Sequence, residues 1–378
     1  MTVSSSIKIH DTTLRDGEQM SGVVFDFDEK LRIAEKAIDF GVDLIDIMPV
    51  VSDGEFKVTK ELAGRFGSKV SAACRCKKSD VDLSIDAGAC RVTLISPLSD
   101  LHITQRLRIT REENLNNAAE LVDYARAHGL IVDIAGEDAS RADLDYLKLF
   151  LECVHDKIAL FVLSDTVGCL TPKSTRDLVS YVKENSDCDV CLHLHNDFGL
   201  ATANTIEGIM AGADYFSGTF TGIGERAGNA PIEEVCTALH FLYGKELEVK
   251  YGMLKEICDM VQELSGVKTQ RHKPIIGENA FSHESGIHID GVLKNPKTYE
   301  FLDPEVVGQK RRICLGKHSG KKALQYVLGD KFSLENFDSV DVDLILKEIK
   351  TMRKDNAVSV SSEDVLEIIS RLESQKQR

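Results

Sequence analysis

Long hydrophobic runs are missing from this chain of 378 residues. The best apolar stretch, Ile158–Leu163, has the length of a strand and falls far short of the roughly 20 residues that span a bilayer. The N-terminus also lacks a basic segment followed by a long apolar segment, so no signal peptide is expected. These absences predict a cytoplasmic protein without a membrane partner.

Positive charge is scarce, because 46 Lys and Arg stand against 61 Asp and Glu, giving a net charge of −15. This balance argues against nucleic acid as a partner, since general binding to a phosphate backbone depends on clustered basic residues. A local basic pocket can still bind a small anion. The hydrophobic share of 43% excludes a disordered chain. The ten cysteines are scattered, which is typical of reduced thiols in a cytosolic protein.

A short β-rich run followed by a loop and an amphipathic helix recurs up to about residue 245. Eight such units match a (β/α)8 TIM barrel in count and length. A doubly wound open sheet is the alternative, but such sheets usually carry a Gly-rich turn after the first strand. The predicted strands are Ile7–Thr12, Leu44–Met48, Val70–Cys74, Arg91–Ile95, Ile131–Ile134, Ala159–Leu163, Val190–Leu194 and Tyr215–Phe220.

Helix-end signals support this division. Thr110 and Glu113 have the spacing of a capping box, Thr171 precedes a proline at the first helical position, and Gly41 and Gly129 stand where a left-handed C-cap is expected.

Beyond residue 245 the pattern changes: Leu254–Leu264 is one more predicted helix, Lys268–Gly320 is rich in turn residues, and residues 321–378 are mostly helical. The clearest helices there are Val340–Met352 and Ser362–Leu372. We therefore expect a catalytic barrel over residues 1–265, a linker or lid subdomain over 266–325, and a C-terminal helical subdomain over 326–378.

His193 and His195 lie two apart on the seventh predicted strand, so their side chains share a face. At the carboxyl end of a barrel strand both point toward the mouth, where catalytic groups of this fold gather. With Asp16 after the first strand and Asn229 after the eighth, they could ligate a divalent metal. Two alternatives are a pair of core histidines and a zinc site that uses the nearby Cys188–Cys191 segment.

Other polar residues follow the remaining strands. Arg15 could stabilise a carbonyl oxygen that gains negative charge, and Glu137 is a possible acid or base. Thr166 could hold a carboxylate. His288 lies outside the barrel strands and could reach over the mouth as a general base. Each of them could equally have a structural role.

Three motifs carry a family resemblance: DTTLRDGEQ at Asp11–Gln19, HLHNDFGLA at His193–Ala201 and GIGERAGN at Gly222–Asn229. They resemble the signatures of the DRE-TIM metallolyases, and more narrowly the group of 2-isopropylmalate, homocitrate and citramalate synthases. The segment NAFSHESGIH at Asn279–His288 resembles the synthases rather than the lyases of that superfamily. The resemblance spans about residues 7 to 325.

The resemblance implies a metal-dependent acyltransferase that condenses acetyl-CoA with a 2-oxo acid and then hydrolyses the thioester. It implies that Mg²⁺, Mn²⁺ or Zn²⁺ is the metal and that Arg15 stabilises the oxyanion. Glu137 and His288 would handle the methyl proton and the hydrolytic water, in an order that the sequence leaves open. It also implies a homodimer. Metal binding is assigned to Asp16, His193, His195 and Asn229, and substrate binding to Gln19, His102, Asp133 and Thr166.

The amino-acid sequences of several segments most resemble those of nitrogen-fixation-type homocitrate synthases, which would make 2-oxoglutarate the substrate. These segments are Pro97–His102, Asp133–Asp143, Asp303–Gly308 and Leu315–Gly320. Two departures point elsewhere.

The first departure is Asp133, which stands where lysine-pathway homocitrate synthases place an arginine, so Arg75, Lys77 or His102 would have to supply a cation. The second is the second strand, which reads Asp46–Pro49 instead of the family's glutamate and glycine. Alternatives are therefore a 2-isopropylmalate or citramalate synthase, a specialised synthase such as one for 2-phosphonomethylmalate, and, in another class, a carbon–carbon lyase. Because the chain ends at residue 378, no leucine-sensing regulatory domain is expected.

Overall fold

The computed structural model describes residues 6–328, 339–352 and 360–376. Residues 1–5, which belong to the segment where no signal peptide is expected, lie outside the described residues. The chain divides into two compact units, Met1–Thr269 and Gln270–Arg378.

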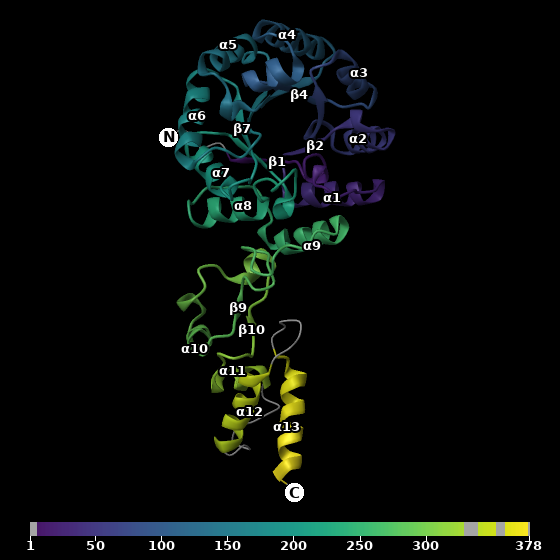
Figure 1. The fold of residues 1–378 in the computed structure, drawn as a ribbon. Helices are drawn as coiled ribbons and strands as arrows, with labels where there is room; N and C mark the ends of the chain where they lie inside the picture. Colours follow the sequence, from purple (N-terminus) through teal and green to yellow (C-terminus); the bar gives the residue numbers. More distant parts are fainter. Residues whose placement is uncertain (1–5, 329–338, 353–359, 377–378) are drawn as a thin grey trace. The chain divides into compact units, whose positions relative to one another are not determined.

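The first unit is a closed barrel of eight parallel strands in chain order, with β1 hydrogen-bonded to both β2 and β8 (Figure 1). This closure confirms the predicted (β/α)8 fold and rules out the open sheet. The strands are β1 (Lys8–Asp11), β2 (Leu44–Ile47), β3 (Val70–Arg75), β4 (Arg91–Pro97), β5 (Ile131–Glu137), β6 (Leu160–Asp165), β7 (Asp189–Leu194) and β8 (Tyr215–Gly218).

Helices cover the outside of the barrel (Figure 1). Their apolar faces pack on the strands, because parallel strands need both faces of the sheet covered. None of the described helices is long and apolar enough to cross a membrane. The helices of this unit are α1 (Phe27–Phe40), α2 (Asp53–Phe66), α3 (Lys78–Asp86), α4 (Arg111–Ala127), α5 (Leu144–Val154), α6 (Pro172–Glu184), α7 (Ala201–Met210), α8 (Ile232–Phe241) and α9 (Leu254–Ser265).

The helix ends confirm the local signals in the sequence. The Glu113 N–H donates to Thr110 Oγ1 at 3.1 Å, and the Thr110 N–H donates to Glu113 Oε2 at 2.7 Å. Thr171 caps α6 ahead of Pro172. Gly41 ends α1 with a φ of 121°, and a Cβ there would lie 2.3 Å from the carbonyl oxygen of Glu248, so both conformation and space require glycine.

The barrel interior is filled in two ways. An apolar cluster that includes Leu160 and Cys191 occupies part of it, and the buried Arg91–Asp133 pair crosses from β4 to β5. The burial of Cys191 in this cluster agrees with an interior strand position rather than a zinc-binding loop. Strand register places His10 of β1 beside Ser217 of β8, which in turn lies beside His193 of β7.

The second unit contains a two-stranded parallel sheet and four described helices. Its apolar cluster joins Ile289 and Leu315 to buried residues within 323–328, 342–349 and 360–369. The described helices of residues 321–376 confirm the predicted helical region, and Ser361 and Asp364 form the N-terminal cap of the last helix. The elements are β9 (Ser282–His283), α10 (Gly286–Lys294), β10 (Arg312–Ile313), α11 (Lys321–Leu328), α12 (Ser339–Thr351) and α13 (Ser362–Lys376).

Helix α10 was not predicted from the sequence, because its short apolar face contains two glycines and is flanked by turn residues. The division of the chain beyond residue 265 into 266–325 and 326–378 stays a prediction.

Candidate active site

A cavity of about 280 Å³ opens at the carboxyl end of the barrel, lined by side chains from all eight strands and the loops that follow them. Strand alternation points every second side chain inward, and the loops after the strands add their first residues. Both charged and apolar groups therefore meet in one space, which is where catalytic residues lie in barrels of this kind.

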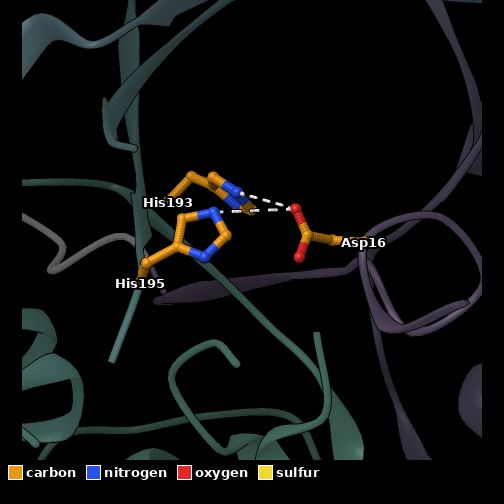
Figure 2. Close-up of side chains that lie close together, drawn as sticks. All are labelled: Asp16, His193 and His195. Carbon is orange, nitrogen blue, oxygen red and sulfur yellow. Dashed lines mark ion pairs between the residues drawn. The ribbon is translucent and has the colours of Figure 1, made fainter. Parts of the chain in front are cut away.

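Asp16, His193 and His195 converge at this cavity (Figure 2). Their ligand atoms all lie within 4.8 Å of one another, and Asp16 Oδ2 is 3.5 Å from His193 Nε2 and 3.7 Å from His195 Nε2. All three residues are buried, and among the described residues they form the one group of three or more potential ligands. The structure thus brings the three strongest metal-ligand predictions together.

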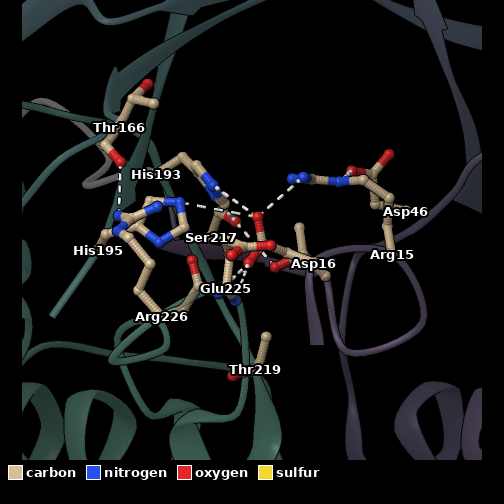
Figure 3. Close-up of polar contacts among 12 residues, drawn as sticks. Arg15, Asp16, Asp46, Thr166, His193, His195, Ser217, Thr219, Glu225 and Arg226 are labelled. Atoms are coloured by element: carbon tan, nitrogen blue, oxygen red, sulfur yellow. Dashed lines mark hydrogen bonds and ion pairs between the residues drawn. The ribbon is translucent and has the colours of Figure 1, made fainter. Parts of the chain in front are cut away.

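The orientation of the His193 ring and the charge state of His195 both suit metal ligands. His193 Nδ1 lies 2.9 Å from Ser217 Oγ, so this hydroxyl orients the ring and leaves Nε2 facing Asp16 (Figure 3). Burial, reinforced by the neighbouring His193, lowers the pKa of His195 to about 4. His195 is therefore neutral at pH 7, and a neutral imidazole is the form that binds a metal.

Asn229 completes the group. Its amide nitrogen donates to Asp16 Oδ1 at 2.6 Å, while its buried carbonyl oxygen has no hydrogen-bond partner. An unpaired buried acceptor next to two imidazoles and a carboxylate is the donor set that a divalent cation would satisfy. These residues fit a metal ion.

Ser217 offers the first test of this arrangement. Ser217→Ala removes the partner of His193 Nδ1, and loss of such an orienting contact typically lowers metal affinity about 10- to 100-fold. We expect this loss in a Mn²⁺ titration. Ser71→Ala is the matched control, because Ser71 is another buried barrel serine whose hydroxyl bonds Thr93 instead. Equal affinities in the two variants would contradict the role of Ser217.

Arg15 lies beside the metal ligands. Its Nε donates to Asp46 Oδ2 at 2.7 Å and its Nη1 to Asp16 Oδ2 at 2.9 Å (Figure 3). Burial opposes ionisation of Asp16, but Arg15 and the two histidines outweigh it and hold the pKa of Asp16 well below its usual range. Asp46, noted in the sequence only as a departure from the family, therefore fixes the guanidinium over the cavity.

Three further predicted residues lie near the mouth, and Gln19, Glu137 and Thr166 all line the cavity. Glu137 forms an ion pair with Arg106 of the π-helix η4 (Leu101–Leu107). The Nδ1 atom of His102, a predicted substrate-binding residue, lies 3.5 Å from Glu137 Oε1. His102 itself is not among the residues that line the cavity.

The Thr166 hydroxyl accepts a hydrogen bond from the Asp138 backbone N–H at 2.8 Å. Its carbonyl accepts one from Arg226 at 2.7 Å (Figure 3). Arg226 in turn is paired with Asp197. The loop after β8 is thereby tied to the end of β6.

Two predicted residues lie elsewhere. Asp133 is fully buried and accepts two hydrogen bonds from Arg91, at 2.6 Å and 2.8 Å, and it is not among the residues that line the cavity. His288 belongs to α10 of the second unit, where its ring stacks on Tyr299 at 4.1 Å between centroids. A structural role for Asp133 explains why an acidic residue is tolerated there, because its charge is already compensated.

Asp133→Ala should therefore act on stability. It leaves the Arg91 charge buried and uncompensated, which costs about 3–5 kcal/mol in comparable cases. We expect a loss of this size in the free energy of unfolding by urea. The double variant with Arg91→Leu and Asp133→Leu should recover much of it, because both charges are removed together. A loss below about 1 kcal/mol for the single variant would contradict the assignment.

Several residues that contact the site residues were not predicted from the sequence. Ser217 could have been found from strand alternation, since it lies on the inward face of the eighth strand beside His193. Arg226 stands inside the third motif, but its bonds to Thr166 and Asp197 join distant segments. Arg106 had no local signal, because its partner Glu137 lies 31 residues away.

Residues 6–261 match the family model described as HMGL-like. The chain belongs to the HMGL-like family. Residues 275–357 match a second model, described as homocitrate synthase post-HMGL domain-like, and this match includes His288. These findings confirm the predicted resemblance to the DRE-TIM synthases.

Three relatives of this HMGL-like chain are similar over most of its length. A 2-isopropylmalate synthase of Sulfolobus acidocaldarius is 44% identical, over 92% of this chain and 91% of the relative. An (R)-citramalate synthase of Methanocaldococcus jannaschii is 41% identical, over 96% of this chain and 74% of the relative. The homocitrate synthase AksA of Methanothermobacter thermautotrophicus is 41% identical, over 92% and 89%. The prediction of an enzyme of the acyltransferase type is confirmed, and the predicted choice of homocitrate synthase is not favoured.

Proposed function

We propose that this HMGL-like protein is a metal-dependent acyltransferase that condenses acetyl-CoA with a 2-oxo acid, in the manner of a 2-isopropylmalate or citramalate synthase. The observation that carries the proposal is the group of Asp16, His193 and His195 beside the Arg15 guanidinium in one cavity. A cation site next to a fixed positive group suits a reaction in which a keto oxygen becomes negatively charged.

We infer the roles of the side chains from their places in the cavity together with the family resemblance. A bound cation would supply Lewis-acid polarisation of the keto group. Arg15 would stabilise the negative charge on the former keto oxygen, and Thr166 would hold the substrate carboxylate. Glu137 would accept a proton from the acetyl methyl group, whose carbon then bonds the keto carbon. Thioester hydrolysis afterwards releases CoA as a thiol.

The wall of the cavity supports a 2-oxo acid with a short, uncharged side chain. Apolar side chains on strands β3 to β6 and just after β2 line the cavity: Met48, Ala73, Ile95, Ala135 and Val162. Each arginine in the lining already has a carboxylate partner: Arg15 with Asp46, Arg75 with Asp80, Arg106 with Glu137, and Arg226 with Asp197. The distal carboxylate of 2-oxoglutarate would therefore have to displace an existing ion pair, so this substrate is less well supported.

A panel of 2-oxo acids tests the proposal. The purified protein is given acetyl-CoA and Mn²⁺ or Mg²⁺ with 2-oxoisovalerate, pyruvate, 2-oxoglutarate, oxaloacetate or phosphonopyruvate, and thiol release and product mass are recorded. We expect 2-oxoisovalerate or pyruvate to give a kcat/KM at least tenfold above that of 2-oxoglutarate. A preference for 2-oxoglutarate would overturn the substrate assignment. Absence of thiol release with all five acids would overturn the reaction itself.

We propose in addition that His288 acts in the reaction and that the protein works as a homodimer. The support is the match of its segment to the second family model, together with the absence of a catalytic partner for its ring within the described part of its own unit, where it stacks on Tyr299. Sedimentation of an active dimer is the expected result. A fully active monomer would contradict this arrangement.

A further inference from the structure

His10 is a buried polar residue that the proposed chemistry does not use. It lies on β1, is 2% exposed and lines the cavity. Neither of its ring nitrogens has a hydrogen-bond partner. Burial lowers the pKa of His10 to about 4, so the ring is neutral at pH 7 and presents one N–H donor and one acceptor. A buried polar group without a partner is unfavourable, and a ligand group could offset this cost.

Asp46 supplies a complementary atom. Its Oδ2 accepts from Arg15 (Figure 3), whereas its Oδ1 is buried without a hydrogen-bond partner. Asp46 Oδ1 lies 3.9 Å from His10 Nε2, which is too far for a direct hydrogen bond. The cavity therefore contains two unsatisfied polar atoms side by side, on neighbouring strands β1 and β2.

The spacing suits one oxygen atom between them. Two atoms 3.9 Å apart can both be reached by a single oxygen at about 2.8 Å from each. A hydroxyl is the group that fits, because it donates its hydrogen to the Asp46 carboxylate and accepts one from the His10 ring. A carboxylate does not fit, since it would place a second negative charge against Asp46.

The position also suits a substrate side chain. Strand register puts His10 at the level of Ser217 and His193, so the pair lies within the same part of the barrel as the metal ligands. A 2-oxo acid held by its keto and carboxylate oxygens would extend its side chain into the cavity, whose lining combines apolar groups with the hydroxyls of Thr93, Ser164 and Ser217.

Resting on the proposed function, we propose that His10 and Asp46 recognise a hydroxyl group on the side chain of the 2-oxo acid. His10 is the specificity-determining residue, because Asp46 also holds Arg15. Among the short, uncharged 2-oxo acids of the proposed function, this assignment favours one that carries a hydroxyl on its side chain.

Matched substrate pairs test this assignment. Hydroxypyruvate is compared with pyruvate, and 4-hydroxy-2-oxobutyrate with 2-oxobutyrate, by thiol release from acetyl-CoA with the metal-loaded protein. Within each pair the carbon skeleton is the same, and the two pairs sample two side-chain lengths. We expect the hydroxylated member of at least one pair to have a kcat/KM ten times higher or more. Equal values within both pairs, or a preference for the plain acids, would overturn the assignment.

His10→Phe separates recognition from a general defect. It should lower the hydroxyl preference at least tenfold while thiol release with the plain acid is retained, which also shows that the variant is folded. His10→Gln keeps a donor and an acceptor and should restore part of the preference. An unchanged preference in His10→Phe would mean that only a water molecule occupies the space, and would overturn the assignment. Absence of thiol release with every 2-oxo acid would instead refute the proposed function.

Discussion

His195→Ala is expected to abolish both metal binding and turnover. Only Asp16 and His193 would then remain of the three residues whose ligand atoms lie within 4.8 Å of one another. Metal content after dialysis should fall from about one ion per chain to the background level. Because Lewis-acid and positioning effects of a metal contribute several kcal/mol to such reactions, kcat should fall by about three orders of magnitude or more.

The matched control is His128→Ala, since His128 is an exposed histidine at the end of α4. This variant should keep both metal content and turnover. An active, metal-loaded His195→Ala variant would remove His195 from the set of ligands.

Arg15→Gln is expected to lower kcat by about 10²- to 10³-fold, the usual effect of removing a group that stabilises an oxyanion. The metal should still bind, because Asp16, His193 and His195 are unchanged. Asp46 would lose its ionic partner, so the thermal midpoint should fall as well. Turnover and Mn²⁺ affinity measured on the same preparation separate the catalytic loss from a loss of metal.

Arg65→Gln serves as the control for arginine replacement, because Arg65 lies exposed on α2 and pairs only with surface glutamates. It should leave kcat unchanged. A variant at Arg15 that keeps wild-type kcat would show that the guanidinium only positions Asp16 and Asp46.

Much of the fold and the metal ligands could be predicted from the sequence for physical reasons. Alternating strand and helix patterns are local, and eight of them leave few topologies. His193 and His195 are two apart on a strand, so their shared direction follows from backbone geometry alone. Asp16 needed only the closure of the barrel, which brings the end of β1 beside β7 and β8.

The pairing of charges inside the barrel could not be predicted in this way. Strand alternation indicates that Asp133 points inward, but not that Arg91 on the neighbouring strand compensates it. The same limit applies to Asp46, which lies 31 residues from Arg15 and meets it only after the barrel closes. Both residues were departures from the family pattern in the sequence, and their partners Arg91 and Arg15 became visible only in the structure.

Metal-dependent thiol release tests the central proposal most directly. Protein freed of metal by chelation is given acetyl-CoA with and without 2-oxoisovalerate or pyruvate, before and after Mn²⁺ or Mg²⁺ is restored. The proposed function predicts release only when the metal and a 2-oxo acid are both present, with loss of that release in His195→Ala. Release that continues without metal, or that stays absent after full metal loading with the whole 2-oxo acid panel, would contradict it.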